Sequence, residues 1–353
     1  MARRRTNPMG RFIVVLILLA ACGWVVRSRM NAGGDRAAEP SAARADVQPP
    51  RDGGQPVLKP VPLPQAPATP QTPPQTIIIP PAPPAEAPPA AAPPEKIAEA
   101  RQAYDQGCTR QAAGNLVEAR RLLSRALASG LLAPKAGEDC RTRLKAIAAT
   151  LVFSREIHPD DPYSREYRVK GGDVLERIVE REKLYVPWQG IARINRIDDP
   201  SKLQLNQRLK LVTGPFDAII TKHAYTLDLY HHGMFVTSFR IGLGQNGSTP
   251  TGRWLVRDRV PAATWTPPAG SDQTAPIECG QPGYPLGRDG LWIALQGLEQ
   301  ANEMVSGFGI HGTDEPDSIG RQASLGCIRL GDADIALLFD LLYRGKSTVE
   351  VRP

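Results

Sequence analysis

The sequence predicts a multidomain fold that ends in a mostly-β C-terminal domain. Before it come, in chain order, an N-terminal anchor with a long linker, a short α-helical segment and a small βααβ unit. Three observations predict this order: a stretch rich in proline and alanine, then apolar residues at helical spacing, then short apolar segments separated by glycine and proline. A chain of 353 residues has room for about two to three domains. We place the boundaries at 1–30, 31–94, 95–157, 165–213 and 216–353.

The first thirty residues combine a basic start with an apolar run. Arginines at positions 3, 4, 5 and 11 precede the apolar residues 12–26, which is the pattern of an exported or membrane-anchored protein. Two interpretations stay open. Leu19–Cys22 resembles a bacterial lipobox with Cys22 as the lipidated residue, whereas Arg27 and Arg29 close the apolar run as in a single-pass anchor, which we favour slightly. Either one tethers the rest of the chain to the membrane, outside the cytoplasm.

Residues 31–94 are rich in proline and alanine and almost free of aromatic residues. Such a composition cannot bury a core, so we expect an extended, disordered linker with polyproline II bias. At ~3.1 Å per residue it reaches on the order of 150–200 Å when stiff. Its apolar patch Ile77–Ile79 is a candidate docking site, although a plain linker is the simpler interpretation.

Apolar residues recur at helical spacing in three runs across residues 95–157, with glycines between the runs. The pattern predicts three amphipathic helices, and the run Gly114–Arg120 resembles a tetratricopeptide-type hairpin. Cys108 and Cys140 fall on apolar faces of different helices. In an oxidising compartment they could form a disulfide, and the sequence leaves this open.

Residues 165–213 are predicted to contain a strand, two helices and a closing strand. Tyr167–Leu175 indicates a strand, a turn and a helix start with Asp173 as the N-cap, Asn195 follows a second helix, and Leu205–Leu211 is the last strand. The unit resembles a LysM domain, a βααβ module that binds glycans containing N-acetylglucosamine. Val174 and Asn206 depart from that family's usual Thr and Gly. A purely structural spacer is the alternative.

The formal net charge of +7 and the pI of about 9.3 suit an acidic polymer such as cell wall or nucleic acid. Nucleic acid is the weaker choice because zinc-finger spacing, an RNP-like aromatic block and a long Lys/Arg run are all missing from the sequence. Five cysteines are too few for a disulfide scaffold and too scattered for a metal site, so we expect no metal and no cofactor.

Short strands are predicted at the start of the C-terminal domain, at 218–220, 226–230 and 235–239, with His231-His232-Gly233 as a hairpin turn. We expect the adjacent histidines to point opposite ways or into solvent, which makes a metal role improbable. Later strands are predicted at 291–295, 309–310 and 347–351, and a helix at 332–342.

One glycine-rich stretch near the C-terminus gathers a histidine, a serine, a cysteine and an arginine. A thiolate nucleophile needs a nearby base and a pocket that polarises a carbonyl. We expect Cys327 to be the nucleophile and His311 its base, with Ser324 and Gly326 in a turn whose backbone N–H groups face an oxyanion. The charge of Arg329 should lower the thiol pKa and can hold a substrate carboxylate.

These residues carry a resemblance. His-Gly-Thr at 311–313 followed by Ser-Leu-Gly-Cys-Ile-Arg at 324–329 is similar to the signature of the L,D-transpeptidases, the YkuD-type peptidoglycan cross-linking enzymes. The resemblance covers about Phe216–Val351. Three upstream blocks fit that family in the expected order: Ser248–Gly252, Trp265–Pro268 and Pro285–Gly287.

The resemblance implies a reaction. Cys327 would attack the amide carbonyl between the diamino acid at stem position three and a terminal D-Ala, and His311, oriented by the carbonyl of Gly312, would move the proton. A thioester forms, D-Ala leaves, and the side-chain amine of another stem resolves it as a 3→3 cross-link. The implied partners are peptidoglycan stem peptides and glycan strands in the cell envelope. We expect the protein to be a monomer.

The resemblance also implies substrate contacts. Residues 262–283 would form a lid over the cleft with Trp265 packed near it, and Thr249 lies in a block that can shape the cleft floor. Tyr284 and Leu325 stand where that family commonly has Asn and His. Cys279 is interpreted as a free thiol of the lid, with redox regulation as a minor alternative.

The acceptor stays open. If water resolves the thioester, the enzyme is an L,D-carboxypeptidase, and if a protein lysine does, it anchors a protein to the wall. A further alternative is a non-catalytic wall-binding structural protein.

Overall fold

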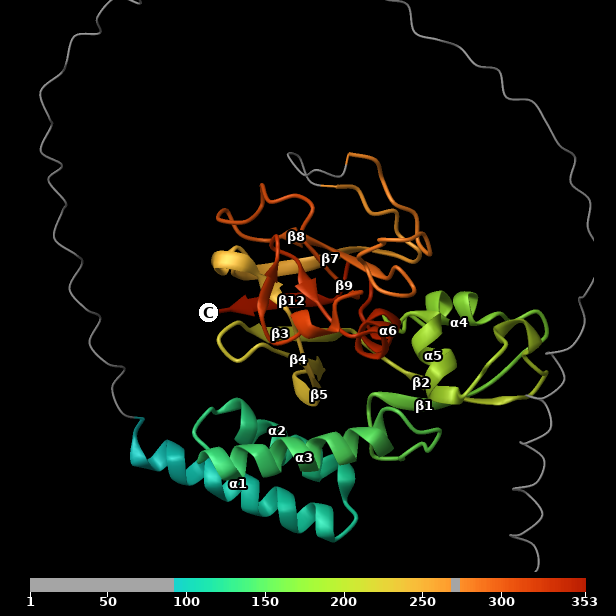
Figure 1. Ribbon diagram of the computed structural model, residues 1–353. Helices are drawn as coiled ribbons and strands as arrows, with labels where there is room; N and C mark the ends of the chain where they lie inside the picture. Colours follow the sequence, from blue (N-terminus) through green and yellow to red (C-terminus); the bar gives the residue numbers. More distant parts are fainter. Residues whose placement is uncertain (1–91, 268–273) are drawn as a thin grey trace, which may run out of the picture. The chain divides into compact units, whose positions relative to one another are not determined.

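The structure is a computed structural model that describes residues 92–267 and 274–353, all of them in one compact unit (Figure 1). The anchor or lipobox at 1–30 and nearly all of the linker at 31–94 lie outside the described residues, as does the Ile77–Ile79 patch. Among the residues described, no helix has the length and apolar character to cross a membrane.

Three helices form the first described segment: α1 (Pro94–Ala112), α2 (Leu116–Ala128) and α3 (Pro134–Leu151). α1 and α3 each begin at a proline, whose fixed φ and missing N–H suit the first helical turn. α2 begins after Asn115, whose side chain accepts a hydrogen bond from the Glu118 N–H at 3.3 Å. Helix α1 starts at Pro94, a residue that the sequence analysis placed in the linker.

Both cysteines of this segment are free thiols in the structure. Cys140 is fully buried between helices, and its Sγ donates to the Leu123 carbonyl at 3.3 Å. Burial raises the pKa of the Cys140 thiol to about 12, and the neighbouring Cys108 adds to that rise.

The next unit has the order strand, helix, helix, strand. Its elements are β1 (Ser164–Arg168), α4 (Leu175–Arg181), α5 (Trp188–Asn195) and β2 (Arg208–Val212), with a 3₁₀ turn at Pro200–Lys202 before β2. β1 and β2 pair antiparallel from Ser164↔Val212 to Arg168↔Arg208. Whether this unit is a LysM domain stays a prediction.

Two details of that unit differ from expectation. The N-cap of α4 is Val174, which makes no side-chain capping bond, so assigning the cap to Asp173 was wrong. Asp173 instead accepts hydrogen bonds from the Lys170 N–H, at 2.9 Å, and from the Tyr167 hydroxyl, at 2.6 Å, which satisfy its carboxylate inside the turn. Asn195 ends α5 rather than following it.

An eight-stranded sheet forms the C-terminal domain, in the order β11-β9-β8-β7-β12-β3-β4-β5. Its strands are β3 (Phe216–Thr221), β4 (Thr226–His231), β5 (Met234–Arg240), β7 (Gly252–Val260), β8 (Trp292–Gly297), β9 (Gly309–His311), β11 (Ile328–Arg329) and β12 (Thr348–Arg352). A separate parallel pair joins β6 (Leu243–Gly244) to β10 (Gln322–Ser324). This domain is mostly β, as predicted.

The sheet is held by a continuous apolar core. On β3 alternate residues point inward, namely Phe216, Ala218 and Ile220, and all three are buried. Helix α6 (Asp332–Leu341) adds buried residues to the same core. The core also includes residues of α3, α5 and β2, so the preceding units share it with the sheet. The 3₁₀ turns Gln245–Gly247 and Pro316–Ser318 flank the site described below.

The paired histidines do not point opposite ways, so that expectation was wrong. The Nε2 atoms of His231 and His232 both lie on the Thr213 carbonyl oxygen, at 2.7 and 2.9 Å. A carbonyl only accepts, so both Nε2 atoms carry hydrogen, and Nδ1 of neutral His231 accepts from Arg120 Nη2 at 3.3 Å. Over the described residues, no cluster of His, Cys, Asp or Glu could hold a metal ion.

Candidate active site

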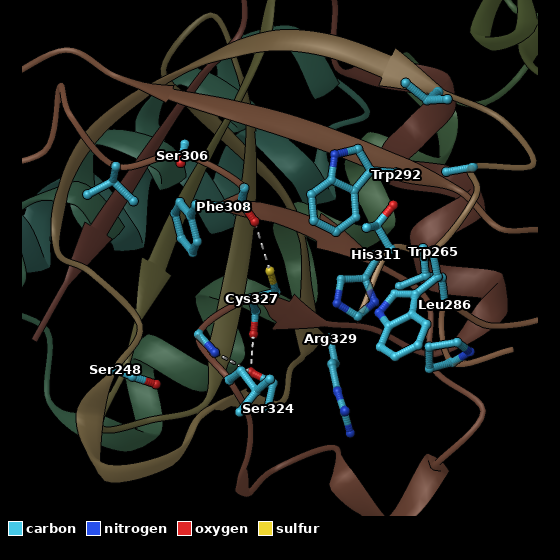
Figure 2. A pocket seen from close by; sticks show the side chains of 18 of the residues that line it. Ser248, Trp265, Leu286, Trp292, Ser306, Phe308, His311, Ser324, Cys327 and Arg329 are labelled. Atoms are coloured by element: carbon cyan, nitrogen blue, oxygen red, sulfur yellow. Dashed lines mark hydrogen bonds between the residues drawn. The ribbon is translucent and has the colours of Figure 1, made fainter. Parts of the chain in front are cut away.

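Two neighbouring parallel strands bring the predicted base and nucleophile together. β9 and β11 pair Ile310 with Ile328 and His311 with Arg329. Because side chains alternate along a strand, both isoleucines enter the core while His311 and Arg329 share the opposite face. Cys327 lies two residues before Arg329 and so reaches the same face, where Figure 2 shows its thiol beside the imidazole.

A cavity of about 740 Å³ opens at this face. Six of the predicted site residues line it: His311, Ser324, Gly326, Cys327, Arg329 and Trp265. Three predicted residues do not, namely Thr249, Tyr284 and Gly312. Cavities of this size accommodate small organic molecules and short peptides.

His311 is held neutral and in one orientation. Its Nδ1 lies 2.5 Å from the carbonyl oxygen of Gly312, so Nδ1 carries the hydrogen and Nε2 has a free lone pair. The imidazole is 5 % exposed and stacks on the Trp292 indole. Burial lowers the pKa of His311 to about 4, helped by the charge of Arg329 and opposed by the Gly312 hydrogen bond. A neutral imidazole of this tautomer can accept a proton from a thiol.

Cys327 is a protonated thiol in this environment. Its Sγ donates to the Gly307 carbonyl at 3.5 Å (Figure 2). Burial raises the pKa of the Cys327 thiol, and this outweighs the Gly309 N–H and the Arg329 charge, which both lower it. The Arg329 charge does lower the pKa of Cys327, as expected. The pKa is nevertheless raised overall, because desolvation of the thiolate is the larger effect.

Ser324 locks the turn that carries the thiol. Its Oγ donates to the Cys327 carbonyl at 2.6 Å and accepts from the Gly326 N–H at 3.1 Å. Gly326 has φ of +153°, a backbone conformation that other residues rarely adopt. Thr249 supports the turn from beneath, because its buried Oγ1 accepts from Gly244 N–H and donates to the Gly326 carbonyl, both at 2.8 Å.

A comparison with known protein families covers the segment that carries these residues. The family model of the L,D-transpeptidase catalytic domain, YkuD, matches residues 216–351. These residues form a YkuD-type L,D-transpeptidase catalytic domain. The predicted extent of the resemblance is confirmed.

Relatives agree on the family. The chain is 25 % identical over 194 residues to the putative L,D-transpeptidase YkuD of Bacillus licheniformis, covering 53 % of this chain and 98 % of that protein. It is 34 % identical over 195 residues to the probable L,D-transpeptidase YcfS of Escherichia coli, covering 49 % of this chain and 57 % of that one. The chain thus spans little more than half of the Escherichia coli relative. Among solved structures, an L,D-transpeptidase from Mycobacterium smegmatis matches with a TM-score of 0.31 and 15 % identity, over 42 % of this chain and 65 % of that one.

The Pro-Leu-Gly block of the transpeptidase domain supports the base. Gly287 has φ of +79°, and a Cβ there would lie 2.9 Å from the Thr313 N and 3.0 Å from the Gly312 Cα. Only glycine lets this segment pack against the end of β9, where the carbonyl of Gly312 orients His311.

Tyr284 is part of the loop core of the transpeptidase domain rather than a cavity residue. It is 7 % exposed, its hydroxyl donates to the Ala263 carbonyl, and it packs in a small cluster with Ala263 and Leu286. Tyr284 therefore does not line the cavity, and a substrate contact at Tyr284 stays a prediction. Trp265 packs against the same cluster and does line the cavity, held by paired backbone hydrogen bonds with Ile277 at 2.9 Å.

Sequence reasoning missed three residues of the site. Trp292 stacks on the base and Phe308 lines the cavity near the thiol (Figure 2). The third is Glu315, whose Oε2 lies 2.5 Å from Arg329 Nη1. Trp292 carried no sequence signal because its role depends on pairing β8 with β9. Glu315 could have been found as an acidic residue inside the motif, four positions after the base.

Proposed function

We propose that the chain is a cysteine L,D-transpeptidase of the bacterial cell envelope that forms 3→3 peptidoglycan cross-links and releases D-Ala. The observation that carries this proposal is the meeting of Cys327 and His311 in one cavity, with the imidazole neutral and oriented by the Gly312 carbonyl. The family of the catalytic domain supports the same chemistry.

In the proposed mechanism His311 Nε2 takes the proton of the Cys327 thiol as the sulfur attacks the amide carbonyl before D-Ala. The resulting oxyanion is stabilised by backbone N–H groups of the turn. The Gly326 N–H already donates to Ser324, so we assign this role to the amides of Leu325 and Cys327. His311 then protonates the leaving amine of D-Ala, and a thioester remains.

The second half of the reaction reuses the same groups. The side-chain amine of another stem attacks the thioester carbonyl and passes a proton through His311 to the departing sulfur. Arg329 holds a substrate carboxylate and Trp265 packs against the bound stem, both from the cavity wall. Ser324, Gly326, Gly312 and Thr249 act by positioning the turn and the base.

The units before the catalytic domain hold the enzyme at its substrate. We propose that the βααβ unit is a LysM-type glycan-binding domain and the helical segment a tetratricopeptide-like spacer behind a membrane tether. Val174 and Leu205, on the loops before α4 and before β2, are exposed apolar residues at 40 % and 68 %. Such side chains can stack on the apolar face of a sugar ring.

Intact-protein mass spectrometry of the full chain in detergent tests the proposal. Incubation with a disaccharide-tetrapeptide should give an adduct on Cys327 and a cross-linked dimer lacking one D-Ala, and Cys327→Ala should give neither. Cys279→Ala is the matched control because it removes another partly exposed thiol.

The alternatives give different products. Tripeptide alone indicates an L,D-carboxypeptidase, and transfer of the stem to a protein lysine indicates a wall-anchoring enzyme. A folded protein with a free Cys327 thiol and no adduct indicates the structural wall-binding alternative. Deleting the βααβ unit is a poor test of wall binding, because it shares its core with the sheet. The double variant Val174→Asp/Leu205→Asp is a better test of wall binding. We expect less of this variant than of wild type to be retained on isolated sacculi.

A further inference from the structure

The Arg329 guanidinium in the active site is already paired with a carboxylate, that of Glu315. Glu315 Oε2 lies 2.5 Å from Nη1 of Arg329. The Arg329 side chain is 15 % exposed and lines the cavity, as Figure 2 shows. The Nε atom of Arg329 is buried and has no hydrogen-bond partner within residues 92–267 and 274–353. The guanidinium is therefore charge-paired at one end and unsatisfied at its other, inner end.

The Glu315 side chain can leave Arg329 without a change in the backbone. Its backbone is fixed, because its N–H donates to Thr313 Oγ1 at 3.0 Å and its carbonyl accepts from Ser318 Oγ at 2.6 Å. Its side chain, in contrast, is 62 % exposed, so the carboxylate can leave Arg329 for water without moving the backbone. Pairs with one exposed partner are weak, since water replaces the lost contact.

We propose that Glu315 is an internal competitor for Arg329, displaced by the free carboxylate of the acyl donor. A carboxylate that bridges Nε and a terminal N–H satisfies the buried donor that Glu315 leaves open, so it binds better than the residue it replaces. Two carboxylates on one guanidinium repel each other, so binding of one expels the other.

This mechanism selects substrates. A donor with a free carboxylate beside the scissile amide can displace Glu315 and settle on Arg329, whereas a donor amidated at that position leaves Glu315 in place. Arg329 thus favours anionic acyl donors over neutral ones, and Glu315 is a specificity-determining residue that reduces this preference, because only an anionic donor has to displace it. The inference rests on the proposed function in one respect, that Arg329 receives a carboxylate of the substrate.

Paired alkylating reagents test the inference without any peptidoglycan substrate. The Cys327 thiolate displaces iodide from iodoacetate or from iodoacetamide, which differ only in the carboxylate. In the full chain, we expect Glu315→Gln to raise the ratio of the iodoacetate rate to the iodoacetamide rate about five-fold, because a competing charge near the reaction centre is removed. The ratio cancels any change in thiol pKa, which affects both reagents equally.

Asp317→Asn is the matched control. It neutralises an exposed carboxylate two positions along the same turn, and the ratio should stay within about two-fold of wild type, as expected for a solvated charge. Arg329→Met combined with Glu315→Gln should abolish the rise. An unchanged ratio in Glu315→Gln, or an equal rise in Asp317→Asn, overturns the inference.

A tetrapeptide and its C-terminal amide separate this inference from the proposed function. With Glu315→Gln, KM should fall for the free acid and change little for the amide. If wild type acylates with the tetrapeptide but Glu315→Gln changes neither KM nor the alkylation ratio, the transpeptidase proposal stands and the role of Glu315 fails. If wild type never acylates but the alkylation ratio rises in Glu315→Gln, the role of Glu315 stands and the transpeptidase proposal fails.

Discussion

The imidazole of His311 lies flat against the indole of Trp292, with ring centroids 5.4 Å apart and an angle of 13° between the planes. The two residues are direct partners across the antiparallel strands β8 and β9. The indole keeps water from one face of the base, which is one physical reason that burial lowers the pKa of His311 to about 4.

Trp292→Ala should therefore raise the pKa of His311 from about 4 toward its ordinary value near 6.5. The acid limb of the pH profile of kcat/KM should move up by about one to two pH units, because only neutral His311 accepts the thiol proton. Trp292→Phe keeps an aromatic face on the imidazole and should shift the limb less. An identical limb in all three proteins would show that the stack does not set the pKa.

The thiol and the imidazole should both be neutral at pH 7. Burial raises the pKa of Cys327 and lowers that of His311 to about 4, so a preformed ion pair is disfavoured. Alkylation of Cys327 by iodoacetamide should accelerate steadily as pH rises from 6 to 9, about ten-fold per unit, since only the thiolate reacts. Peptide mapping distinguishes Cys327 from the other cysteines. A plateau between pH 5 and 8 would instead indicate a thiolate–imidazolium pair.

Thr249→Val should weaken the catalytic turn without touching the cavity. The change leaves the Gly244 N–H and the Gly326 carbonyl buried without their partner, which costs about 2 to 3 kcal/mol. We expect Tm to fall by roughly 5–10 °C and acylation of Cys327 to slow. Thr249→Ser retains the hydroxyl and should restore most of both. Wild-type Tm in Thr249→Val would mean that the turn does not depend on these bonds.

The protein should lose stability in mild acid. His231 is buried between Arg120 and the Thr213 carbonyl, and burial together with the Arg120 charge holds its pKa well below the ordinary 6.5. Between the folded pKa of His231 and its ordinary pKa of 6.5, the unfolded state binds more protons than the folded state. The stability contribution is complete above pH 6.5 and is lost as pH falls from there toward the folded pKa.

Between pH 7 and 5 the free energy of unfolding should therefore drop by about 2 kcal/mol for His231, and by a similar amount for His311. Urea unfolding at the two pH values measures the drop. His231→Gln lacks the titrating group and should show a drop smaller by about 2 kcal/mol, whatever its stability at pH 7. His223→Gln is the control, because His223 is exposed. Equal drops in His231→Gln and wild type would contradict the assignment.

Part of this site could be derived from the sequence. Local chemistry identified Cys327, His311, Ser324 and Arg329, because nucleophile, base, turn residue and cation fall within one short stretch separated by glycines. The Gly312 carbonyl could also be anticipated, since it is the neighbour of the base. Strand positions in the C-terminal domain followed from alternating apolar residues, which one face of a sheet requires.

Other features depended on contacts between distant segments. The sequence assigned substrate contacts to Thr249 and Tyr284, but the fold buries one beneath the catalytic turn and the other in the loop core. The direction of the Cys327 pKa was likewise settled by burial, which no neighbouring residue reveals. The sequence by itself determined which groups can react. Only the tertiary structure decided their protonation, their orientation and the Glu315 contact on Arg329, because desolvation and cross-strand packing are properties of the assembled sheet.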